Sequence, residues 1–301
     1  MLPLKQYFKN PRLFFSSLLR EMGCLFPDKQ YLQMLYYLKT GKRLDLKNPQ
    51  TFGDKIQWLK LYNRKAGHVT IADKYAVKDY VSKIIGDSYV IPTLGIWNKP
   101  EDVDFDCLPR QFVLKTTHGG GNCGVIICKD KATLDKAAVI SQLKKSMKQN
   151  IYRTLREWQY KRIKPRIIAE QYLSDGREEL KDYKFYCFNG EPMYCQVMSG
   201  RRERMTVDFY DMDWMLMPFS GFGKNYPHAK KKCPAPVTLL EMKRISNLLS
   251  SGNPFMRVDL YECDNRLYFG EMTLFPASGM GSFLPQEWNQ IMGNLIILPR
   301  K

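Results

Sequence analysis

The sequence contains little histidine and no closely paired cysteines. Its three histidines, His68, His118 and His228, are not spaced with cysteines as zinc ligands usually are. The eight cysteines are scattered, without a C-x-x-C pair, and several lie in apolar, strand-like runs. Free cysteine behaves there as a small hydrophobic residue, the usage of a reducing compartment. These features argue against a zinc site and predict a cytoplasmic protein.

Long hydrophobic runs are also missing. No segment approaches the roughly 18 consecutive apolar residues of a membrane span. Residues 2–19 hold many large apolar side chains, but Lys, Asn and Pro11 interrupt them too often for a secretory signal. An amphipathic helix lying peripherally on the inner face of a membrane is one interpretation of this pattern. A helix packed on the body of the protein is the other.

Acidic residues are the minority charge. Thirty Asp and Glu stand against 47 Lys and Arg, which gives a net charge of +17. A field of this sign attracts polyanions, so nucleotide phosphate, an acidic glycan, anionic lipid and nucleic acid are candidate partners. The basic residues form only short clusters, at 161–162, 201–202 and 230–232, without a long basic tail or a nucleic-acid-binding module. We therefore expect no nucleic-acid partner.

The first hundred residues have the pattern of helices. The hydrophobic content of 44% is that of a globular protein, and neither internal repeats nor low-complexity segments occur. Apolar residues recur at helical spacing, and Thr51 with Asp54 has the form of a capping box. The elements predicted here are helices at 28–40, from 51 and at 75–85, the last ending at Gly86, and a short strand at 89–94 ended by Pro92.

From residue 112 the pattern changes to β. Predicted strands lie at 112–115, 124–128 and 166–173, alternating runs at 182–198 and 205–210 predict an antiparallel sheet, and helices are predicted at 131–149 and 239–250. The predicted fold class is therefore α+β. We expect a mainly helical N-terminal region at 1–109 and two α+β lobes at 110–173 and 174–301.

Near the C terminus, two strands joined by a tight turn each carry a carboxylate among apolar neighbours. If residues 264–266 form a three-residue loop, Asp259 lies opposite Glu271, and Arg257 lies opposite Thr273. Like charges across a ladder repel, and Mg²⁺, which prefers hard oxygen ligands, would bridge them. The alternative is a surface hairpin with two solvated acids.

A glycine-rich loop lies between two predicted strands. Lys115 ends the first strand, and His118, Gly119, Gly120 and Gly121 follow. Consecutive glycines let backbone N–H groups turn inward around an anion, which the lysine can neutralise. The loop matches neither a Walker A motif nor a dinucleotide-binding G-x-G-x-x-G. A glycine-rich hairpin turn has the same composition, so the loop alone does not decide between the two.

The order of these features is more specific than any one of them. In chain order they are Asp73-Lys74 before a helix, Lys115 with its glycine loop, Ile167-Ile-Ala-Glu-Gln-Tyr-Leu173, Asp182-Tyr-Lys184, Arg257-x-Asp259 and Glu271. This order resembles the ATP-grasp superfamily over about residues 70–280. Four further stretches are Lys47-Asn-Pro-Gln-Thr-Phe52, Lys55-Ile-Gln-Trp-Leu-Lys-Leu-Tyr62, Ala72-Asp-Lys-Tyr-Ala-Val77 and Lys184-Phe-Tyr-Cys-Phe-Asn-Gly190. They are similar to the branch named after teichuronopeptide biosynthesis, found among capsule and cell-surface polysaccharide genes, and extend the resemblance to nearly the whole chain.

The resemblance implies an ATP-grasp fold, in which two α+β lobes clamp ATP. Residues 110–173 would then be the lid lobe, and 174–301 the lobe with the metal-binding hairpin. Lys74 and Lys115 would contact the ATP phosphates, and Gly119, Gly120 and Gly121 would close over them. His118 would contact either phosphate or an acceptor carboxylate, with a loop-bracing role as the equal alternative.

The same resemblance implies roles for the remaining site residues. Glu170, Gln171 and Leu173 would form the hinge whose backbone pairs with adenine, and Glu178 or Glu179 would reach the ribose. Lys184 would face the γ-phosphate, Asp259 and Glu271 would bind Mg²⁺, and Arg257 would steady the acyl phosphate. The family's third metal ligand is usually Asn two residues after the Glu, but this chain has Thr273 there, which leaves a hydroxyl or a water in that place.

The reaction that the resemblance implies is ligation. A carboxylate attacks the γ-phosphate of ATP to give an acyl phosphate, and an amine opens it to an amide, which needs positioning and charge neutralisation rather than an acid–base triad. The expected substrates are ATP, an acidic sugar or uronic-acid polysaccharide, and an amine or amino acid.

Two other function classes compete with the ligase. A glycosyltransferase of capsule biosynthesis is the alternative, and its D-x-D motif has matches at Asp211-Met-Asp213 and Asp102-Val-Asp104, although three-residue motifs arise easily by chance. A non-catalytic scaffold on an anionic membrane is disfavoured by the polar residues that recur on the predicted strands.

Overall fold

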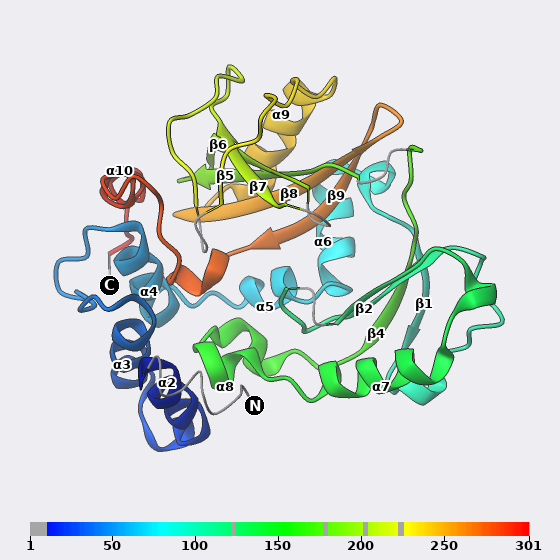
Figure 1. Cartoon of the computed structure of the whole chain (residues 1–301), viewed down its shortest axis with the longest axis horizontal. Helices are drawn as coiled ribbons and strands as arrows, with labels where there is room; N and C mark the ends of the chain where they lie inside the picture. The colour runs from blue at the N-terminus through cyan, green and yellow to red at the C-terminus, as the bar shows by residue number, and fades with distance from the viewer. Residues whose placement is uncertain (1–10, 122–123, 177–179, 201–203, 222–225, 301) are drawn as a thin grey trace.

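Two antiparallel β-sheets and a group of helices make up the molecule (Figure 1). The computed structural model describes residues 11–121, 124–176, 180–200, 204–221 and 226–300. Within these ranges the smaller sheet has the strand order β1-β4-β2-β3 and the larger has β7-β6-β5-β8-β9. The combination of helices and sheets confirms the predicted α+β class.

The bounds of the elements are as follows. The strands are β1 (Thr93–Trp97), β2 (Phe112–Thr116), β3 (Val125–Cys128), β4 (Ile167–Gln171), β5 (Asp182–Phe188), β6 (Glu191–Ser199), β7 (Thr206–Tyr210), β8 (Phe255–Cys263) and β9 (Arg266–Thr273). The helices are α2 (Pro11–Glu21), α3 (Asp28–Thr40), α4 (Phe52–Tyr62), α5 (Gly67–Ala72), α6 (Ala76–Ile85), α7 (Lys136–Met147), α8 (Ile151–Leu155), α9 (Leu239–Ser250) and α10 (Trp288–Leu295).

The helices before β1 begin and end at the signals in the sequence. The Thr51 hydroxyl accepts the Asp54 N–H and the Asp54 carboxylate accepts the Thr51 N–H, which confirms the predicted capping box. α6 ends at Gly86, whose φ of 99° favours glycine. In the described part of the chain, no helix is long and apolar enough to cross a membrane.

The strand predicted at 89–94 is wrong. Residues Asp87–Tyr89 form a 3₁₀ turn, and β1 begins only at Thr93, after Pro92. Proline has no N–H to donate to a ladder, so the strand starts beyond it rather than ending at it. β1 pairs with β4 and so belongs to the smaller sheet, although it precedes the boundary at 109/110, which stays a prediction.

The smaller sheet is packed against α7. The core between them consists of Phe112, Leu114, Cys128, Val139, Leu143, Ile167 and Ala169, with Val103, Phe105 and Leu108 beside it. α7 begins at Lys136, later than the predicted 131, because the Asp135 side chain caps it by accepting the Ala138 N–H. Residues before that cap form a separate 3₁₀ turn, Lys131–Thr133.

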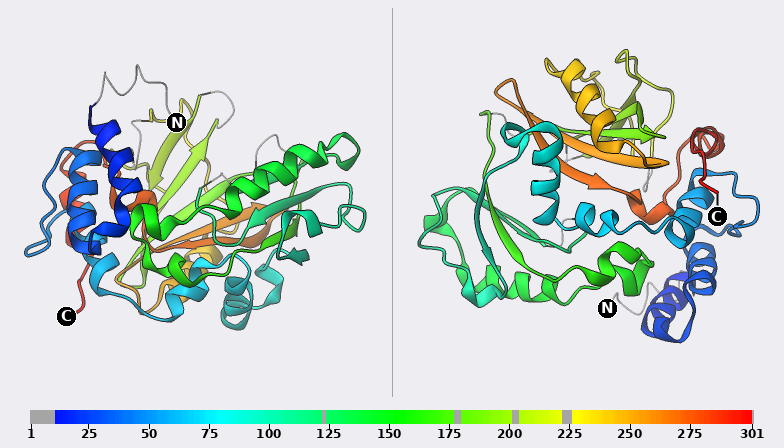
Figure 2. Two further views of the ribbon diagram at one scale, coloured as in Figure 1. Left: turned by 90° about the horizontal axis from the view of Figure 1, so that it is seen from below. Right: turned by 180° about the vertical axis from the view of Figure 1, so that it is seen from behind.

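The larger sheet carries the main core, and every residue of its central strand β5 is buried. α9 buries Met242, Ile245 and Leu249 on the side of this sheet that faces away from the smaller one (Figures 1 and 2). Because side chains alternate along a strand, the opposite face carries a different set of residues. Lys184 and Asp259, which pair across β5 and β8, lie on that face.

A buried lysine joins three segments that are far apart in sequence. Lys60 of α4 donates to the carbonyl (2.7 Å) and hydroxyl (2.6 Å) oxygens of Ser278 and to the carbonyl oxygen of Leu155 (3.2 Å). Ser278 follows β9 in the segment Pro276–Gly279, where it has a left-handed φ of 54°. Burial lowers the pKa of Lys60 to about 8, while the charge of the buried Glu157 acts to raise it.

Candidate active site

The turn between β8 and β9 differs from the predicted one. Its loop has two residues, Asp264 and Asn265, with φ of 52° and 58°, and Cys263 pairs with Arg266. Positive φ at both central residues is the signature of a two-residue hairpin turn that matches the twist of the strands. The three-residue loop predicted at 264–266 is therefore wrong.

A bulge at Gly270 compensates for the shorter loop. Leu260 pairs with Phe269, but Asp259 pairs with Glu271, so one extra residue lies in β9 between these two pairs. A Cβ on Gly270 would lie 2.8 Å from the Tyr261 ring and 3.0 Å from the Asp259 carbonyl oxygen, which leaves room for glycine alone. The predicted pairing of Asp259 with Glu271 is thus confirmed, and both carboxylates lie on one face of the sheet.

Two cations of the chain contact Asp259 directly. Arg257 donates from Nε (2.7 Å) and Nη2 (2.8 Å) to the two carboxylate oxygens, and Lys184 donates at 2.5 Å. Lys184 also donates to Asp182 at 2.5 Å, and Arg257 to the Thr273 hydroxyl at 3.1 Å. Part of the charge that the prediction assigned to Mg²⁺ is therefore supplied by Arg257 and Lys184.

Burial raises the pKa of Asp259, whereas two other groups of this face are held in their charged forms. Burial lowers the pKa of Lys184, but the charges of Asp259 and Asp182 outweigh burial, so the pKa is raised above its ordinary value. Burial raises the pKa of Glu271, but the charges of Lys74 and Arg257 outweigh it, so the pKa lies below its ordinary value. At neutral pH Lys184 is therefore an ammonium and Glu271 a carboxylate.

Glu271 is the carboxylate best able to accept a cation. Its two oxygens lie 3.6 Å from Lys74 Nζ and from Arg257 Nη2, beyond the usual length of a hydrogen bond. Asp259 and the Thr273 hydroxyl are already hydrogen-bonded but retain acceptor capacity. These hard oxygen donors suit Mg²⁺. No group of three or more His, Cys, Asp or Glu in the described ranges forms a metal cluster by itself.

The glycine loop faces this hairpin through Lys74. Lys74 Nζ donates to the Gly119 carbonyl and lies beside Glu271, while the Lys74 backbone N–H bonds the Thr117 carbonyl. Lys74 therefore lies between the glycine loop of the smaller sheet and Glu271 of the larger sheet. A Cβ on Gly119 would lie 2.6 Å from the Thr116 hydroxyl, and Gly121 has a φ of 64°, so both positions fit glycine.

His118 lies inside the loop rather than at its surface. The side chain is buried, and burial lowers the pKa of the imidazole, which is therefore neutral at neutral pH. A neutral, buried ring argues against a charged contact with phosphate, and neither ring nitrogen has a hydrogen-bond partner among the described residues, so the loop-bracing role stays a prediction.

Three charged residues meet at the end of β4. The buried Glu170 carboxylate contacts Lys115, as well as Lys78 Nζ at 2.6 Å. Burial raises the pKa of Glu170, but the two lysines outweigh burial and lower it, so the carboxylate is ionised. Lys115 thus contacts Glu170, a residue of the predicted hinge, rather than open solvent.

The other predicted hinge residues lie just beyond this cluster. Gln171 is exposed, and its backbone N–H donates to the carbonyl of Pro92 at 3.1 Å. Leu173 is half-buried after the end of β4. Glu178 and Glu179 lie outside the described residues, so the ribose contact stays a prediction.

Sequence reasoning missed three residues of this site. Asp182 was noticed only as part of a motif, although it shares Lys184 with Asp259. Lys78 follows Lys74 by four positions, but Lys74 lies before the start of α6, so the two do not share a helix face and the spacing is only a weak signal. Nothing in the sequence around Tyr160 marks it as a residue of this site. Burial and the charges of Glu157 and Glu271 raise its pKa well above the ordinary value, which keeps its hydroxyl protonated.

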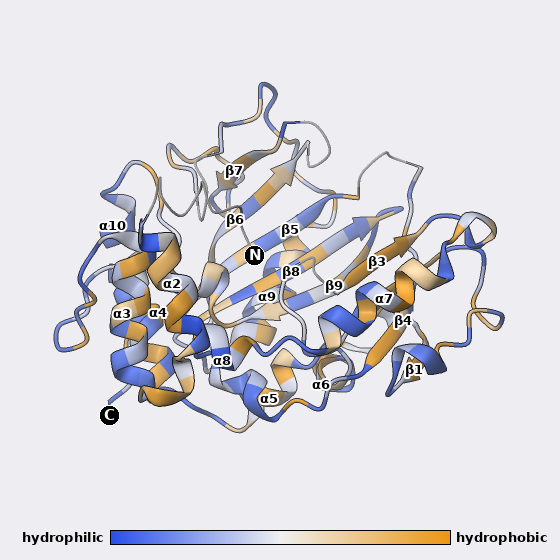
Figure 3. Ribbon diagram, turned by 60° about the horizontal axis from the view of Figure 1, so that its bottom comes forward, coloured by the Kyte–Doolittle hydropathy of each residue, from blue (hydrophilic) through white to orange (hydrophobic). Residues whose placement is uncertain are grey.

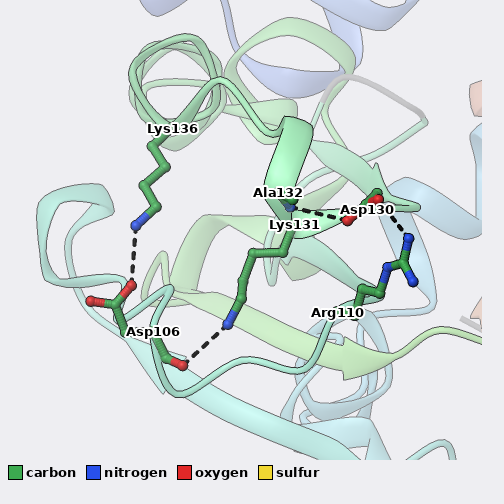
Figure 4. Close-up of a pocket in the computed structure, with 6 residues that line it drawn as sticks. All are labelled: Asp106, Arg110, Asp130, Lys131, Ala132 and Lys136. Atoms are coloured by element: carbon green, nitrogen blue, oxygen red, sulfur yellow. Dashed lines mark hydrogen bonds and ion pairs between the residues drawn. The ribbon is translucent and has the colours of Figure 1, made fainter.

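A separate surface pocket of about 450 Å³ lies on the smaller lobe (Figure 4). Its charged residues bind one another: Arg110 bonds Asp130 at 2.8 Å and Lys136 bonds Asp106 at 3.1 Å. Lys131 donates to the backbone carbonyls of the loop before β2. No residue of the candidate active site lines this pocket.

Comparison with known families agrees with this geometry. The sequence matches the TupA-like ATPgrasp family over residues 54–297. The match covers most of the chain, so the protein belongs to this family, and the resemblance inferred from its motifs is confirmed. No curated protein matches the sequence. Nothing in the comparisons supports the glycosyltransferase alternative.

Several solved structures resemble the chain at low identity. The D-alanine–D-alanine ligase of Bacillus anthracis has 18% identity and a TM-score of 0.41, with 68% of this chain and 57% of that one covered. The corresponding ligase of Helicobacter pylori has 14% identity, a TM-score of 0.44 and coverages of 84% and 70%. The D-alanyl-alanine synthetase A of Vibrio cholerae has 11% identity and a TM-score of 0.45, with 80% of this chain and 67% of that one covered. The chain thus spans a little over half of the Bacillus ligase, and the family match alone carries the assignment.

Proposed function

We propose that this protein is an ATP-dependent carboxylate–amine ligase. It would form an amide through an acyl phosphate and attach an amine or amino acid to a uronic acid of a capsular or cell-surface polysaccharide or its precursor. The observation that carries the proposal is the position of Lys74, which contacts the glycine loop on one side and lies 3.6 Å from Glu271 on the other. One cation therefore links a phosphate-binding loop to a carboxylate pair suited to a metal.

The roles of the residues follow from their charge and contacts. In the proposed complex Lys74 and Lys115 bind the ATP phosphates, and Lys78, which also contacts Glu170, keeps that carboxylate neutralised when Lys115 turns to the nucleotide. Lys184 faces the γ-phosphate, and Arg257 stabilises the negative charge that develops on the acyl group. Asp259 and Glu271 would hold Mg²⁺, with Thr273 beside them. When bound, the metal supplies charge neutralisation between the phosphates.

The substrates are proposed from charge and compartment. ATP and a uronic acid are both anions, and a protein with a net charge of +17 attracts both of them electrostatically. The cysteine usage supports action in the cytoplasm, where ATP is available. Membership of the TupA-like family supports an envelope polysaccharide as the acid.

Product analysis tests the reaction class. We expect the purified protein to release ADP and phosphate from Mg-ATP only when a suitable uronic acid is present, and hydroxylamine to trap the acyl phosphate as a hydroxamate. The panel should combine glucuronic and galacturonic acids, free and nucleotide-linked, with amino acids as amines. Turnover of a nucleotide-sugar without ATP consumption would replace the ligase with the glycosyltransferase.

A further inference from the structure

The first helix presents its large apolar side chains to solvent. On α2, Phe14 is 50% exposed, Phe15 53% and Leu18 44%, whereas Ser16 and Leu19 are the buried residues among those whose side chains the structure describes. Figure 3 shows the hydrophobic colouring of α2 and α3 at one end of the molecule, beside α4. A helix that only packed on the body would bury its large apolar residues.

α2 and α3 together form an apolar groove. It has a volume of about 330 Å³ and is lined by Phe15, Leu18, Met22, Met34, Tyr37 and Leu38, among others. Exposed clusters of this kind mark surfaces that bind another apolar phase. None of the candidate active-site residues lies in the groove, so this surface is separate from the candidate active site.

The α2–α3 segment that forms the groove, here called its basic rim, is rich in Lys and Arg, and Arg12 lies over the ring of Tyr37 in the groove lining. Residues 11–43 contain six basic residues, Arg12, Arg20, Lys29, Lys39, Lys42 and Arg43, against two acidic ones, Glu21 and Asp28. Asp28 is bound by Arg64 and Arg156, and in the described residues none of the six has an ion-pair partner. Burial and, to a smaller extent, the charge of Arg20 lower the pKa of Lys39, so these two basic side chains lie near each other on the rim.

We propose that the α2–α3 face docks the protein on the surface of an anionic lipid bilayer. Apolar side chains flanked by unpaired Lys and Arg are the combination that places a helix in the plane of a membrane interface. A second copy of the chain fits less well, because it would bring two basic rims together in a molecule of net charge +17. The proposal is independent of the ligase reaction.

Vesicle binding tests this surface. The full chain, without ATP, is sedimented with vesicles of phosphatidylcholine alone or with phosphatidylglycerol, at low and high salt. We expect binding only to the anionic vesicles, and weaker binding at high salt. A variant with Phe14→Ser, Phe15→Ser and Leu18→Ser should bind at least about tenfold more weakly, because three apolar side chains no longer enter the interface.

A matched control separates this face from general stickiness. Met215, Val237 and Leu240 are 62%, 79% and 79% exposed elsewhere on the molecule, and changing all three to Ser should leave vesicle binding intact. Circular dichroism melts should show both variants folded. Equal losses in the two variants, or no binding by the wild type, would overturn the proposal. So would a dimer, seen by light scattering, that only the α2 variant dissociates.

Discussion

Asp259 determines the charge balance of the candidate active site. Its carboxylate accepts from Arg257 and Lys184, and Lys184 is shared with Asp182. The face holds three carboxylates, Asp182, Asp259 and Glu271, and three cations, Lys74, Lys184 and Arg257. It is therefore close to neutral before a substrate binds. A polyphosphate needs further positive charge, which Lys115 and a bound Mg²⁺ would provide.

Lys115 is the residue whose loss should weaken nucleotide binding most directly. Lys115→Met keeps the length of the side chain but removes its charge, and Lys78 still neutralises Glu170. We expect Mg-ATP affinity to fall about tenfold or more, because the free energy of one hydrogen bond to a charged group corresponds to about that change in affinity. Calorimetric titration measures it. Lys136→Met, on the exposed pocket of the same lobe, is the control, and equal affinities in both variants would remove Lys115 from the site.

His68 should make stability depend on pH. Burial lowers its pKa to about 4, and its Nε2 lies 3.2 Å from the Asn253 side-chain oxygen, so the folded state holds the neutral ring. The unfolded chain titrates near the ordinary value of about 6.5 and binds more protons in between. The stability contribution is therefore complete above about pH 6.5 and is lost as pH falls toward 4, up to roughly 3 kcal/mol.

Urea unfolding at pH 7.5 and 4.5 checks this sign. The wild type should lose more stability between the two values than His68→Gln, which cannot titrate there. The two proteins losing the same amount would show that His68 is protonated in the folded state as well.

At the scale of elements, the β8–β9 hairpin shows what the sequence could and could not predict. Alternation of apolar and polar residues placed Asp259 and Glu271 on one face correctly. The path to that register was wrong, because the loop is one residue shorter and Gly270 adds a bulge. Two offsetting shifts leave the same final pairing, so the pattern of carboxylates cannot distinguish them. The glycine inside the strand was the available signal.

Replacing the bulge glycine should disturb the carboxylate pair. In Gly270→Ala the new methyl group would meet the Tyr261 ring and the Asp259 backbone. We expect a loss of about 1–3 kcal/mol in stability, the usual cost of overpacking, together with reduced ATP turnover. Gly67→Ala is the control, because nothing lies within 4 Å of its Cβ position. Unchanged turnover in Gly270→Ala would mean that the register of the hairpin does not matter for catalysis.

At the scale of the whole molecule, the sequence predicted the α+β class and the family, but not which charges meet. Period and spacing are local properties, and they located most helices and strands before residue 280. Lys60 and Ser278 are 218 residues apart, and no local pattern brings them together. The helix α5 and the C-terminal α10 were also missed, since their short apolar segments lack capping signals.

The cluster around Lys60 should stabilise the assembly of these distant segments. Lys60 of α4 is fully buried against the Leu155 carbonyl and Ser278, and the charge of the buried Glu157 acts to raise its pKa. Burial raises the pKa of Glu157 and Lys60→Met removes the cation that opposes this, so we expect urea unfolding to show a loss of about 3 kcal/mol or more. Glu157→Gln should also destabilise, because it leaves the ammonium uncompensated.

The double variant decides whether the two charges act together. Lys60→Met with Glu157→Gln removes both buried charges, so its loss should be smaller than the sum of the two single losses by about 1 kcal/mol or more. Melting curves for all four proteins at pH 7, below the lowered pKa of Lys60, measure this coupling while the lysine is charged. Strictly additive losses would instead mean that Lys60 acts only through its hydrogen bonds to Ser278 and Leu155, with no contribution from Glu157.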